Sequence, residues 1–302
     1  MKKMKMRGLC LLFAALLCSV AVAGCKKTDE QGSGDTTQDT QKTKEYVILQ
    51  GEPSTSYNFG DEEYAIAFRK GDVDLCRAVQ AALDEILADG TAAKISTEWF
   101  GSDVLLRDNE YASDADAAGG DGSFAYVQQK GTLIIGLDNE YPPMGFLDDN
   151  GELTGIDIAL AKAIEGKLGV TVVFQPIAWS AKDTELKTKN IDCIWNGLSV
   201  NEDRKEAYTL SKPYLANAQI VLTANDSGIA TIADLEGKRV GTQDGSAALE
   251  AMTQSGYTEK FSDLQTYETF YAAYLDLKAA RIDALVGDKT FIEYILSAQT
   301  EQ

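Results

Sequence analysis

In the stretch IDIALAKAIEGKLGVTVVF, residues 156–174, a helix-forming run passes directly into a strand-forming run. The first part, as far as Leu168, is predicted to form a helix that ends at Gly169, because glycine accepts the left-handed conformation of a C-cap. The remaining run, VTVVF, is predicted to form a strand. A predicted strand over 132–137 precedes this unit and another over 191–198 follows it. This alternation predicts an α/β fold.

Strands and helices keep alternating to the end of the chain. Further strands are predicted over 218–224, 238–241 and 284–287. Further helices are predicted over 180–189, from residue 201, and over 247–255, 266–280 and 291–298. The helix over 180–189 opens with Ser180-Ala181-Lys182-Asp183, which is close to a capping box with Asp in place of Glu. No strand follows the last helix to close the sheet.

Residues 45–106 supply what this half of the chain lacks. They contain two apolar runs, 46–49 and 64–68, followed by helix-like stretches over 72–89 and 91–99. Two strands and two helices in about 60 residues cannot bury a stable core alone. Because each half lacks elements that the other has, the order predicts a circularly permuted chain.

The composition excludes several classes of function. The formal net charge of the 302 residues is −19 at pH 7, and there is no histidine. Nucleic acid is excluded as a partner, since binding it requires a basic surface. The lack of histidine removes Ser-His-Asp and Cys-His catalysis and the commonest zinc ligand. We therefore expect one or two globular domains without a catalytic residue, a metal or a cofactor.

Residues 1–24 are predicted to be a lipoprotein signal peptide. Basic residues precede the apolar run 9–23, which is short for a membrane span. Val22-Ala23-Gly24-Cys25 resembles a bacterial lipobox with Cys25 as the lipidated residue, which predicts an extracytoplasmic protein anchored to the cell membrane. An ordinary cleaved signal peptide is the alternative. Residues 25–43 are polar and are predicted to be a flexible tether.

A second polar stretch, residues 109–122, lies in the middle of the chain and is predicted to be a linker. Such a stretch is unusual inside a compact domain but is expected where two ancestral termini were joined. Of the remaining cysteines, Cys76 lies near a helix start and Cys193 in a buried strand. An exported protein permits a disulfide between them, but nothing in the spacing requires one, and two buried thiols are the favoured alternative.

Several motifs resemble the polar amino-acid substrate-binding proteins of bacterial ABC importers, solute-binding protein family 3. Residues 155–164, GIDIALAKAI, resemble the signature helix of that family, and IDCIWNGLS at 191–199, followed by Glu202-Asp203-Arg204, resembles its ligand-carboxylate motif. Residues 68–72 and 88–101 resemble its C-terminal helices. Two positions depart from the family: Ala159 replaces an acidic residue, and Ala247 replaces a common Thr. The order departs too, because the last quarter of the family stands first here.

The resemblance implies a two-lobed periplasmic-binding-protein-like fold of type II, circularly permuted, with a ligand cleft between the lobes. In this family the chain crosses between the lobes at two points. Placed on this sequence, these crossings put hinges near 216–217 and 54–57. Lobe 1 is then expected over 57–108 and 123–216. Lobe 2 is expected over 44–53 and 218–302.

The resemblance also implies which residues surround the ligand. They are Asp138, Tyr141, Trp179, Asn196, Gly197, Ser199, Arg204, Gln243, Ser246 and Asp288. Arg204 offers a planar fork to the α-carboxylate, with Ser199 and the backbone N–H groups after Ser246 as further donors. Asp288 is expected to pair with the α-ammonium, together with the carbonyl of Gly197. Taken singly, a solvated Arg204 and a helix-capping Asp288 are the alternatives.

The pocket for the ligand side chain is expected between Tyr141 and Trp179, whose rings suit an aliphatic stem or a cation. Asp138 and Glu140 at its far end favour a basic amino acid, narrowly over glutamine or another polar one. Trp179 has the alternative of being a core residue.

We therefore predict a non-enzymatic protein that captures a free polar L-amino acid by closing its lobes and delivers it to an ABC permease. The ATPase belongs to another chain, since no P-loop is present. The alternatives are a ligand-sensing receptor component and an enzyme resembling cyclohexadienyl dehydratase on the same scaffold. A monomer is expected, and a domain-swapped dimer is the competing arrangement.

Overall fold

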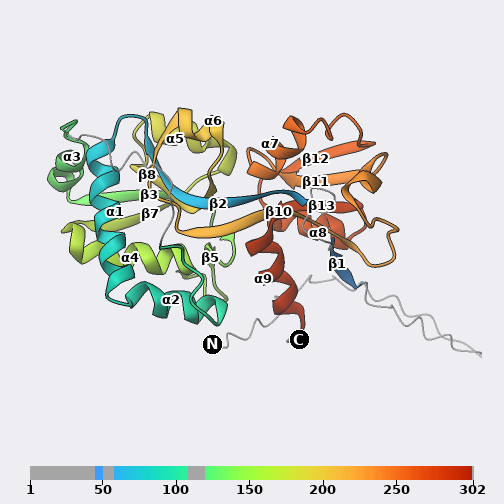
Figure 1. Ribbon diagram of the computed structural model, residues 1–302, viewed down its shortest axis with the longest axis horizontal. Helices are drawn as coiled ribbons and strands as arrows, with labels where there is room; N and C mark the ends of the chain where they lie inside the picture. The colour runs from blue at the N-terminus through green and yellow to red at the C-terminus, as the bar shows by residue number, and fades with distance from the viewer. Residues whose placement is uncertain (1–44, 50–57, 108–119, 301–302) are drawn as a thin grey trace, which may run out of the picture.

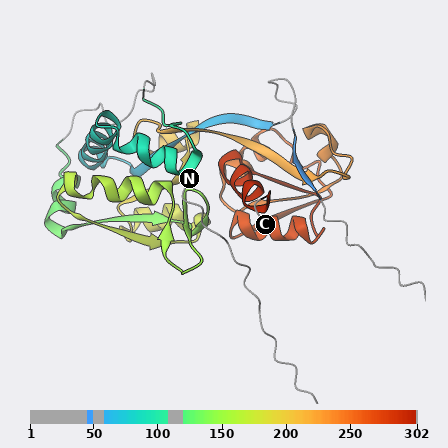
Figure 2. The same ribbon diagram turned by 90° about the horizontal axis from the view of Figure 1, so that it is seen from below.

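The computed structural model describes residues 45–49, 58–107 and 120–300. The predicted signal peptide, Cys25, the predicted tether, most of the predicted linker and the predicted hinge at 54–57 lie outside the described residues. The described chain forms two lobes, seen side by side in Figure 1 and again, turned by 90°, in Figure 2.

One ten-stranded mixed sheet runs through both lobes, in the order β12-β11-β13-β10-β2-β8-β3-β7, with β1 also pairing with β10 and β9 with β2. Its strands are β1 (Tyr46–Ile48), β2 (Asn58–Arg69), β3 (Thr132–Leu137), β7 (Thr171–Pro176), β8 (Cys193–Ser199), β9 (Tyr208–Leu210), β10 (Leu215–Ala224), β11 (Arg239–Gln243), β12 (Asp263–Tyr267) and β13 (Ala284–Asp288). A small second sheet contains β4 (Glu140–Tyr141), β5 (Gly145–Leu147) and β6 (Leu153–Thr154).

The helices divide between the two lobes. They are α1 (Val73–Ala88), α2 (Thr91–Phe100), α3 (Ser123–Lys130), α4 (Ile156–Leu168), α5 (Lys182–Lys187), α6 (Glu202–Ala207), α7 (Ala247–Gln254), α8 (Phe270–Lys278) and α9 (Lys289–Thr300), with 3-10 turns at Trp179–Ala181 and Ile232–Leu235. Helices α1 to α6 lie around β3, β7 and β8, whereas α7, α8 and α9 lie around β11 to β13 (Figure 1). In the described residues, no helix combines the length and the apolarity that a membrane span needs.

Two long antiparallel strands, β2 and β10, connect the lobes (Figures 1 and 2). The first part of β2 pairs with β10 and the second part pairs with β8 and β9, so β2 lies in the middle of the sheet. Strand β1 pairs with the far end of β10, with Val47 opposite Thr223. The leading segment thus supplies both strands and, through α1 and α2, helices that pack on α4. This is the pairing expected if residues 45–106 complete the fold of residues 123–302.

Most predicted elements are present, but two expectations are wrong and several short elements were not predicted. Residues 263–267, the last two of which were expected in a helix, form the parallel edge strand β12, and α8 begins only at Phe270. The helix α3 follows the linker at Ser123 and was not predicted. The capping box at Ser180–Asp183 does not form, because the carboxylate of Asp183 accepts a hydrogen bond from the Tyr208 hydroxyl instead. The C-cap at Gly169 is left-handed, as expected.

Cys76 and Cys193 are both buried and are not joined in a disulfide, so the two-thiol alternative is confirmed. They lie where α1 covers the sheet. Burial raises the pKa of the Cys193 thiol well above its ordinary value. Both side chains therefore act as small apolar core residues.

Candidate functional site

A narrow cavity of about 10 Å³ lies between the lobes, and the ten ligand contacts predicted from the sequence line it, whereas Glu140 does not. The lining residues are Asp138, Tyr141, Trp179, Asn196, Gly197, Ser199, Arg204, Gln243, Ser246, Ala247, Phe270 and Asp288. Ala247 and Phe270 are the members that the sequence did not single out as ligand contacts. Both lobes contribute, so the cavity depends on how the lobes meet.

Arg204 lies at one end of the cavity, in the first turn of α6. The side chain of Asn201 caps this helix by accepting a hydrogen bond from the Arg204 backbone N–H at 2.9 Å. The guanidinium donates to the Ser199 carbonyl at 3.0 Å and to the Glu250 carboxylate at 3.1 Å. Arg204 is only 4% exposed, so the solvated alternative is wrong. Among the described residues its Nε has no partner, which leaves an N–H for an anionic ligand.

Lys182 is a second buried cation beside Arg204 and was not predicted. It is 5% exposed, and its Nζ lies 5.4 Å from the centre of the Trp179 ring. The ammonium donates across the cleft to the carbonyl of Gly245 at 2.9 Å. Burial, helped by repulsion from Arg204, lowers its pKa to about 8. The Arg204 end of the cavity is therefore suited to a carboxylate.

The N-terminus of α7 faces the same end of the cavity. Ser246 caps this helix, its hydroxyl accepting from the backbone N–H of Leu249 at 3.2 Å. Ala247 follows it and lines the cavity without a hydroxyl of its own. The positive end of the helix adds to the attraction for an anion.

Asp288, at the end of β13, brings a negative charge to the cavity, in contrast to Arg204 and Lys182. Its Oδ1 accepts hydrogen bonds from the Tyr64 hydroxyl at 2.8 Å, from Asn217 Nδ2 at 2.6 Å and from Gln219 Nε2 at 2.9 Å. The carboxylate is thus held by side chains of the crossing strands, and the helix-capping alternative is wrong. Burial raises its pKa. This acid lines the cavity without a cationic partner among the described residues.

Glu62 adds a carboxylate behind the lining, and sequence reasoning missed it. Its Oε1 accepts from Ser199 Oγ at 2.5 Å, from Asn217 Nδ2 at 2.6 Å and from Gln219 Nε2 at 2.7 Å. Removal from solvent, and then the Asp288 charge, raise its pKa to about 8. Glu62 stands in a polar run that precedes the apolar one. A signal was present, because strand alternation puts it on the same face as Tyr64.

Gly197 shapes the middle of the cavity. Its φ is +60°, and a Cβ built there would lie 2.9 Å from the Tyr141 ring, so glycine is required. The backbone N–H of Gly197 donates to the Asp157 carboxylate at 2.9 Å, and the Tyr214 hydroxyl donates to the same group at 2.8 Å. Burial raises the pKa of Asp157 to about 7. Asp157, from the signature helix, therefore positions the cavity wall without lining it.

The side-chain end of the cavity is acidic and aromatic. Asp138 accepts from Gln243 Nε2 at 2.7 Å, a bond that joins the two lobes, and burial raises its pKa to about 6. Trp179 is buried and also lines the cavity, so the core and the ligand interpretations both apply. The Tyr141 ring stacks on Phe291 at 6.0 Å, and its hydroxyl lies 2.8 Å from that of Tyr64. One face of the Tyr141 ring is thus covered by Phe291.

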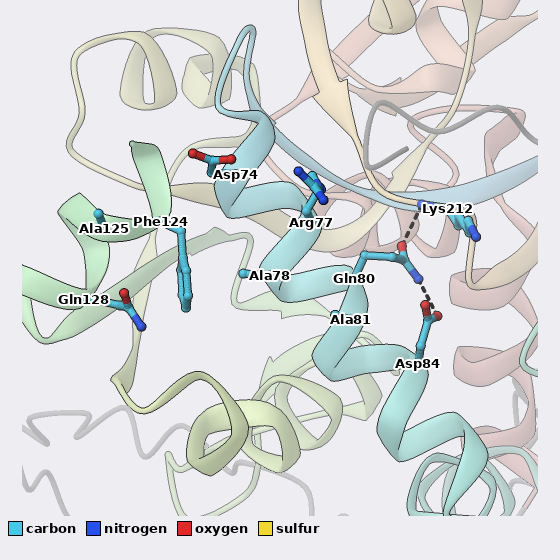
Figure 3. A pocket seen from close by; sticks show the side chains of 10 residues that line it. All are labelled: Asp74, Arg77, Ala78, Gln80, Ala81, Asp84, Phe124, Ala125, Gln128 and Lys212. Atoms are coloured by element: carbon cyan, nitrogen blue, oxygen red, sulfur yellow. Dashed lines mark hydrogen bonds between the residues drawn. The ribbon is translucent and has the colours of Figure 1, made fainter. Parts of the chain in front are cut away.

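A wider hollow lies on the outer side of one lobe, between α1 and α3 (Figure 3). Residues of both signs line it, among them Arg77, Asp84 and Lys212. Gln80 bridges two of these, its amide donating to Asp84 at 2.7 Å while its carbonyl accepts from the Lys212 backbone N–H at 2.8 Å. The residues singled out from the sequence lie elsewhere, so the cavity between the lobes is the candidate site.

Comparison with known proteins gives the family. The model of the bacterial extracellular solute-binding proteins, family 3, matches residues 2–102 and 133–286. The chain therefore belongs to this family, and it has the type II periplasmic-binding-protein fold of its structural relatives.

Individual relatives bind amino acids. The L-cystine-binding protein TcyJ of Escherichia coli is 34% identical over 165 residues, which are 54% of this chain and 61% of that protein. The histidine-binding periplasmic protein of Salmonella typhimurium is 33% identical over 168 residues, 55% of this chain and 64% of that protein. A Streptococcus pneumoniae ABC uptake transporter substrate-binding protein with bound histidine has a TM-score of 0.56 and 35% identity, covering 61% of this chain and 76% of that one. The chain thus spans less than two thirds of these curated relatives.

Proposed function

We propose that this protein captures a polar L-amino acid between its lobes and delivers it to the permease of an ABC importer, whose ATPase is a separate chain. The observation that carries the proposal is the opposed chemistry of one cavity. Arg204, Lys182 and the start of α7 meet at one end, whereas Asp288 stands without a cation among the described residues. A free amino acid presents an α-carboxylate and an α-ammonium that match these groups.

We propose a basic side chain as the first ligand chemistry to test. Asp138 lines the cavity, and the carboxylate of Glu140, two residues along the chain, accepts from the Thr269 hydroxyl at 3.1 Å. Relatives named for arginine, histidine and cystine binding support an amino acid with a polar or charged side chain. Glutamine and cystine are the ligands to compare with arginine and histidine.

The organisation of the chain is part of the same proposal. We propose lobe 1 over 57–108 and 123–216 and lobe 2 over 44–53 and 218–302, in a permuted order with residues 109–122 joining the ancestral termini. The family model matches in two blocks separated by this region, and β1 and β2 complete the sheet of the later segment, both of which support it. Lipid on Cys25 and the tether over 25–43 are proposed to hold the protein outside the cell membrane.

Binding is expected to depend on the charged ends of the cavity more than on its side-chain pocket. Arg204→Ala and Asp288→Ala should each weaken binding by about 2–5 kcal/mol, because the ligand group that faces the lost partner stays buried and unpaired. Trp179→Ala should weaken binding less and broaden the range of ligands. Calorimetric titration with the common L-amino acids measures these effects.

Arg239→Ala is the matched control for Arg204→Ala. Arg239 pairs with Asp283 at 2.6 Å on the surface of lobe 2, away from the cavity, and its loss should leave binding unchanged. If the Arg204 and Asp288 variants bind any amino acid as tightly as the wild type does, the assignment of the site is wrong.

A further inference from the structure

The register of the crossing strands brings two carboxylates together. Strand β10 lies between β2 and β13, with Asn217 opposite Glu62 on one side and Gln219 opposite Asp288 on the other. Residues two apart on a strand point to the same face, so both amides and both acids lie on one face of the sheet. Backbone pairing within one sheet sets this arrangement.

Each amide nitrogen donates to both acids. Asn217 Nδ2 lies 2.6 Å from Glu62 Oε1 and 2.6 Å from Asp288 Oδ1. Gln219 Nε2 lies 2.7 Å and 2.9 Å from the same two oxygens. Both hydrogens of each amide are thereby used, one for each carboxylate. The two acids thus share the same two amide donors. In addition, the Ser199 hydroxyl donates to Glu62 and the Tyr64 hydroxyl donates to Asp288.

No cation neutralises this pair within the described part of the chain, where neither acid takes part in an ion pair. The hydroxyls of Tyr64 and Tyr141 face it from β2 and β4, and that of Thr290 from the start of α9. Beyond Ser199, the Arg204 guanidinium donates to the Ser199 carbonyl and to Glu250 of α7, not to either of these acids. Two carboxylates this close cannot both stay ionised unless a cation lies beside them. Without such a cation, one of the two acids holds a proton.

We propose that Glu62 and Asp288 hold one proton between them before the amino acid binds, and that the ligand's ammonium, docking on Asp288, displaces this proton to solvent. The inference rests on the proposed function and adds a residue to it. Glu62 does not line the cavity, so it is a positioning residue that acts through Asp288 and Ser199. The ammonium keeps its own protons, the O–H bond of the shared carboxylic acid breaks, and the pair becomes doubly ionised beside the new positive charge.

The raised pKa of Glu62, about 8, agrees with a proton held at neutral pH. Releasing it on binding makes affinity rise with pH, because alkaline solution removes the competing proton. Affinity should therefore increase toward a plateau near pH 8, roughly three- to tenfold per pH unit between about pH 6 and 8. Asp138, which lines the cavity, and Lys182, which lies beside Arg204, titrate in a similar pH range, so the difference between variants is the informative quantity.

The experiment counts protons. Full-length protein is titrated calorimetrically with L-arginine, or with L-glutamine if arginine does not bind, in buffers of different ionisation enthalpy at several pH values. The wild type should release close to one proton per ligand near neutral pH. Glu62→Gln keeps the shape and removes the titration, so its proton count should fall toward zero and its affinity should lose the pH slope. Glu63→Gln, the same change one position along β2, should behave as the wild type.

Melting of the ligand-free protein tests the proton itself. A carboxyl whose pKa is raised on folding stabilises the fold fully below its unfolded value, and this contribution is lost as the pH rises through about 8. As the pH rises through about 8, the melting temperature of the wild type should therefore fall by several degrees relative to that of Glu62→Gln. The same melting curves show whether Glu62→Gln folds.

Binding with no proton release, or a Glu62→Gln variant with the wild-type proton count and pH slope, overturns the inference while leaving the amino-acid-binding function intact. If neither amino acid binds, the proposed function and the displacement step both fail for these ligands. In that case the melting test still decides about the shared proton. If the melting temperatures of the wild type and Glu62→Gln change with pH in the same way, the shared proton is overturned as well.

Discussion

At the scale of single residues, the cavity depends on groups that do not touch it. Asp157 is 1% exposed and lies in α4, yet it holds the backbone of Gly197 by one hydrogen bond and the Tyr214 hydroxyl by another. Gly197 in turn must keep a positive φ beneath the Tyr141 ring. A buried acid that accepts such bonds is costly to remove, because its partners stay buried without an acceptor.

Replacing Asp157 by Ala should therefore lower the free energy of unfolding by about 2–5 kcal/mol, since two buried donors lose their partner. Denaturant titration of the ligand-free protein measures this loss. Asp157→Asn keeps an acceptor and should cost less. Because folding raises the pKa of Asp157 to about 7, its carboxyl stabilises the wild type fully below its unfolded pKa and less as the pH rises through 7. The Asn variant should lack this part of the pH dependence, and equal curves for both proteins would contradict the assignment.

At the scale of elements, short helices of one lobe meet the start of α7 and the loop before it in the other. The Lys182 ammonium at the start of α5 donates to the Gly245 carbonyl at 2.9 Å, and Asn201 before α6 donates to Glu250 at 2.6 Å. On the opposite side of the gap, the Phe146 ring lies 5.7 Å from that of Tyr294 in α9. These direct contacts between lobes describe a closed arrangement, so changes in them should shift the balance between closed and open forms.

Lys182→Met should weaken closure, because it removes a hydrogen bond between the lobes and keeps the length of the side chain. We expect a larger radius of gyration in solution scattering without ligand, and amino-acid binding weakened by roughly three- to tenfold, the effect of one net hydrogen bond. Lys187→Met is the control on the same helix, where the side chain is exposed. If the Lys182 and Lys187 variants scatter and bind alike, the contact with Gly245 does not contribute to closure.

At the scale of the whole molecule, the leading segment is part of the centre of the fold. Strand β2 lies between β10 and β8, so removing it would separate the two halves of the sheet and expose both new edges. Helix α1, which contributes Leu75, Val79 and Leu83 to the core, would be lost with it. The order of the chain therefore matters less than the presence of every piece.

A rearranged gene that begins at Ser123, joins Gln302 to Lys44 and ends near Asp108 should fold and bind the same amino acid. Moving the termini to surface positions is usually tolerated, so affinity should change little and the melting temperature by a few degrees. Deleting residues 45–106 should instead give an insoluble or molten product. Light scattering at low concentration separates permutation from exchange between molecules: we expect a monomer that binds ligand, and a dimer that never dissociates would show a domain swap.

From the amino-acid sequence by itself, most local elements and ten of the residues that line the cavity could be predicted. Glycine at a C-cap, apolar runs and the family motifs depend on neighbouring residues, and the helix over 156–168 was recognisable for that reason. The ten predicted ligand contacts line one cavity, and several of them, such as Ser199, Gln243 and Asp288, stand at the end of a strand. The polar edge strand β12 was missed, since among the described strands it pairs with β11 alone and its own pattern is weak.

Only the tertiary structure decided which charges share a partner. Glu62 and Asp288 lie more than two hundred positions apart and meet because β10 pairs with β2 on one side and β13 on the other. Lys182 became a contact between lobes because the 3-10 turn before α5 brings its amine to Gly245. Such encounters depend on strand register and lobe closure, which arise from long-range packing and leave no local pattern in the chain.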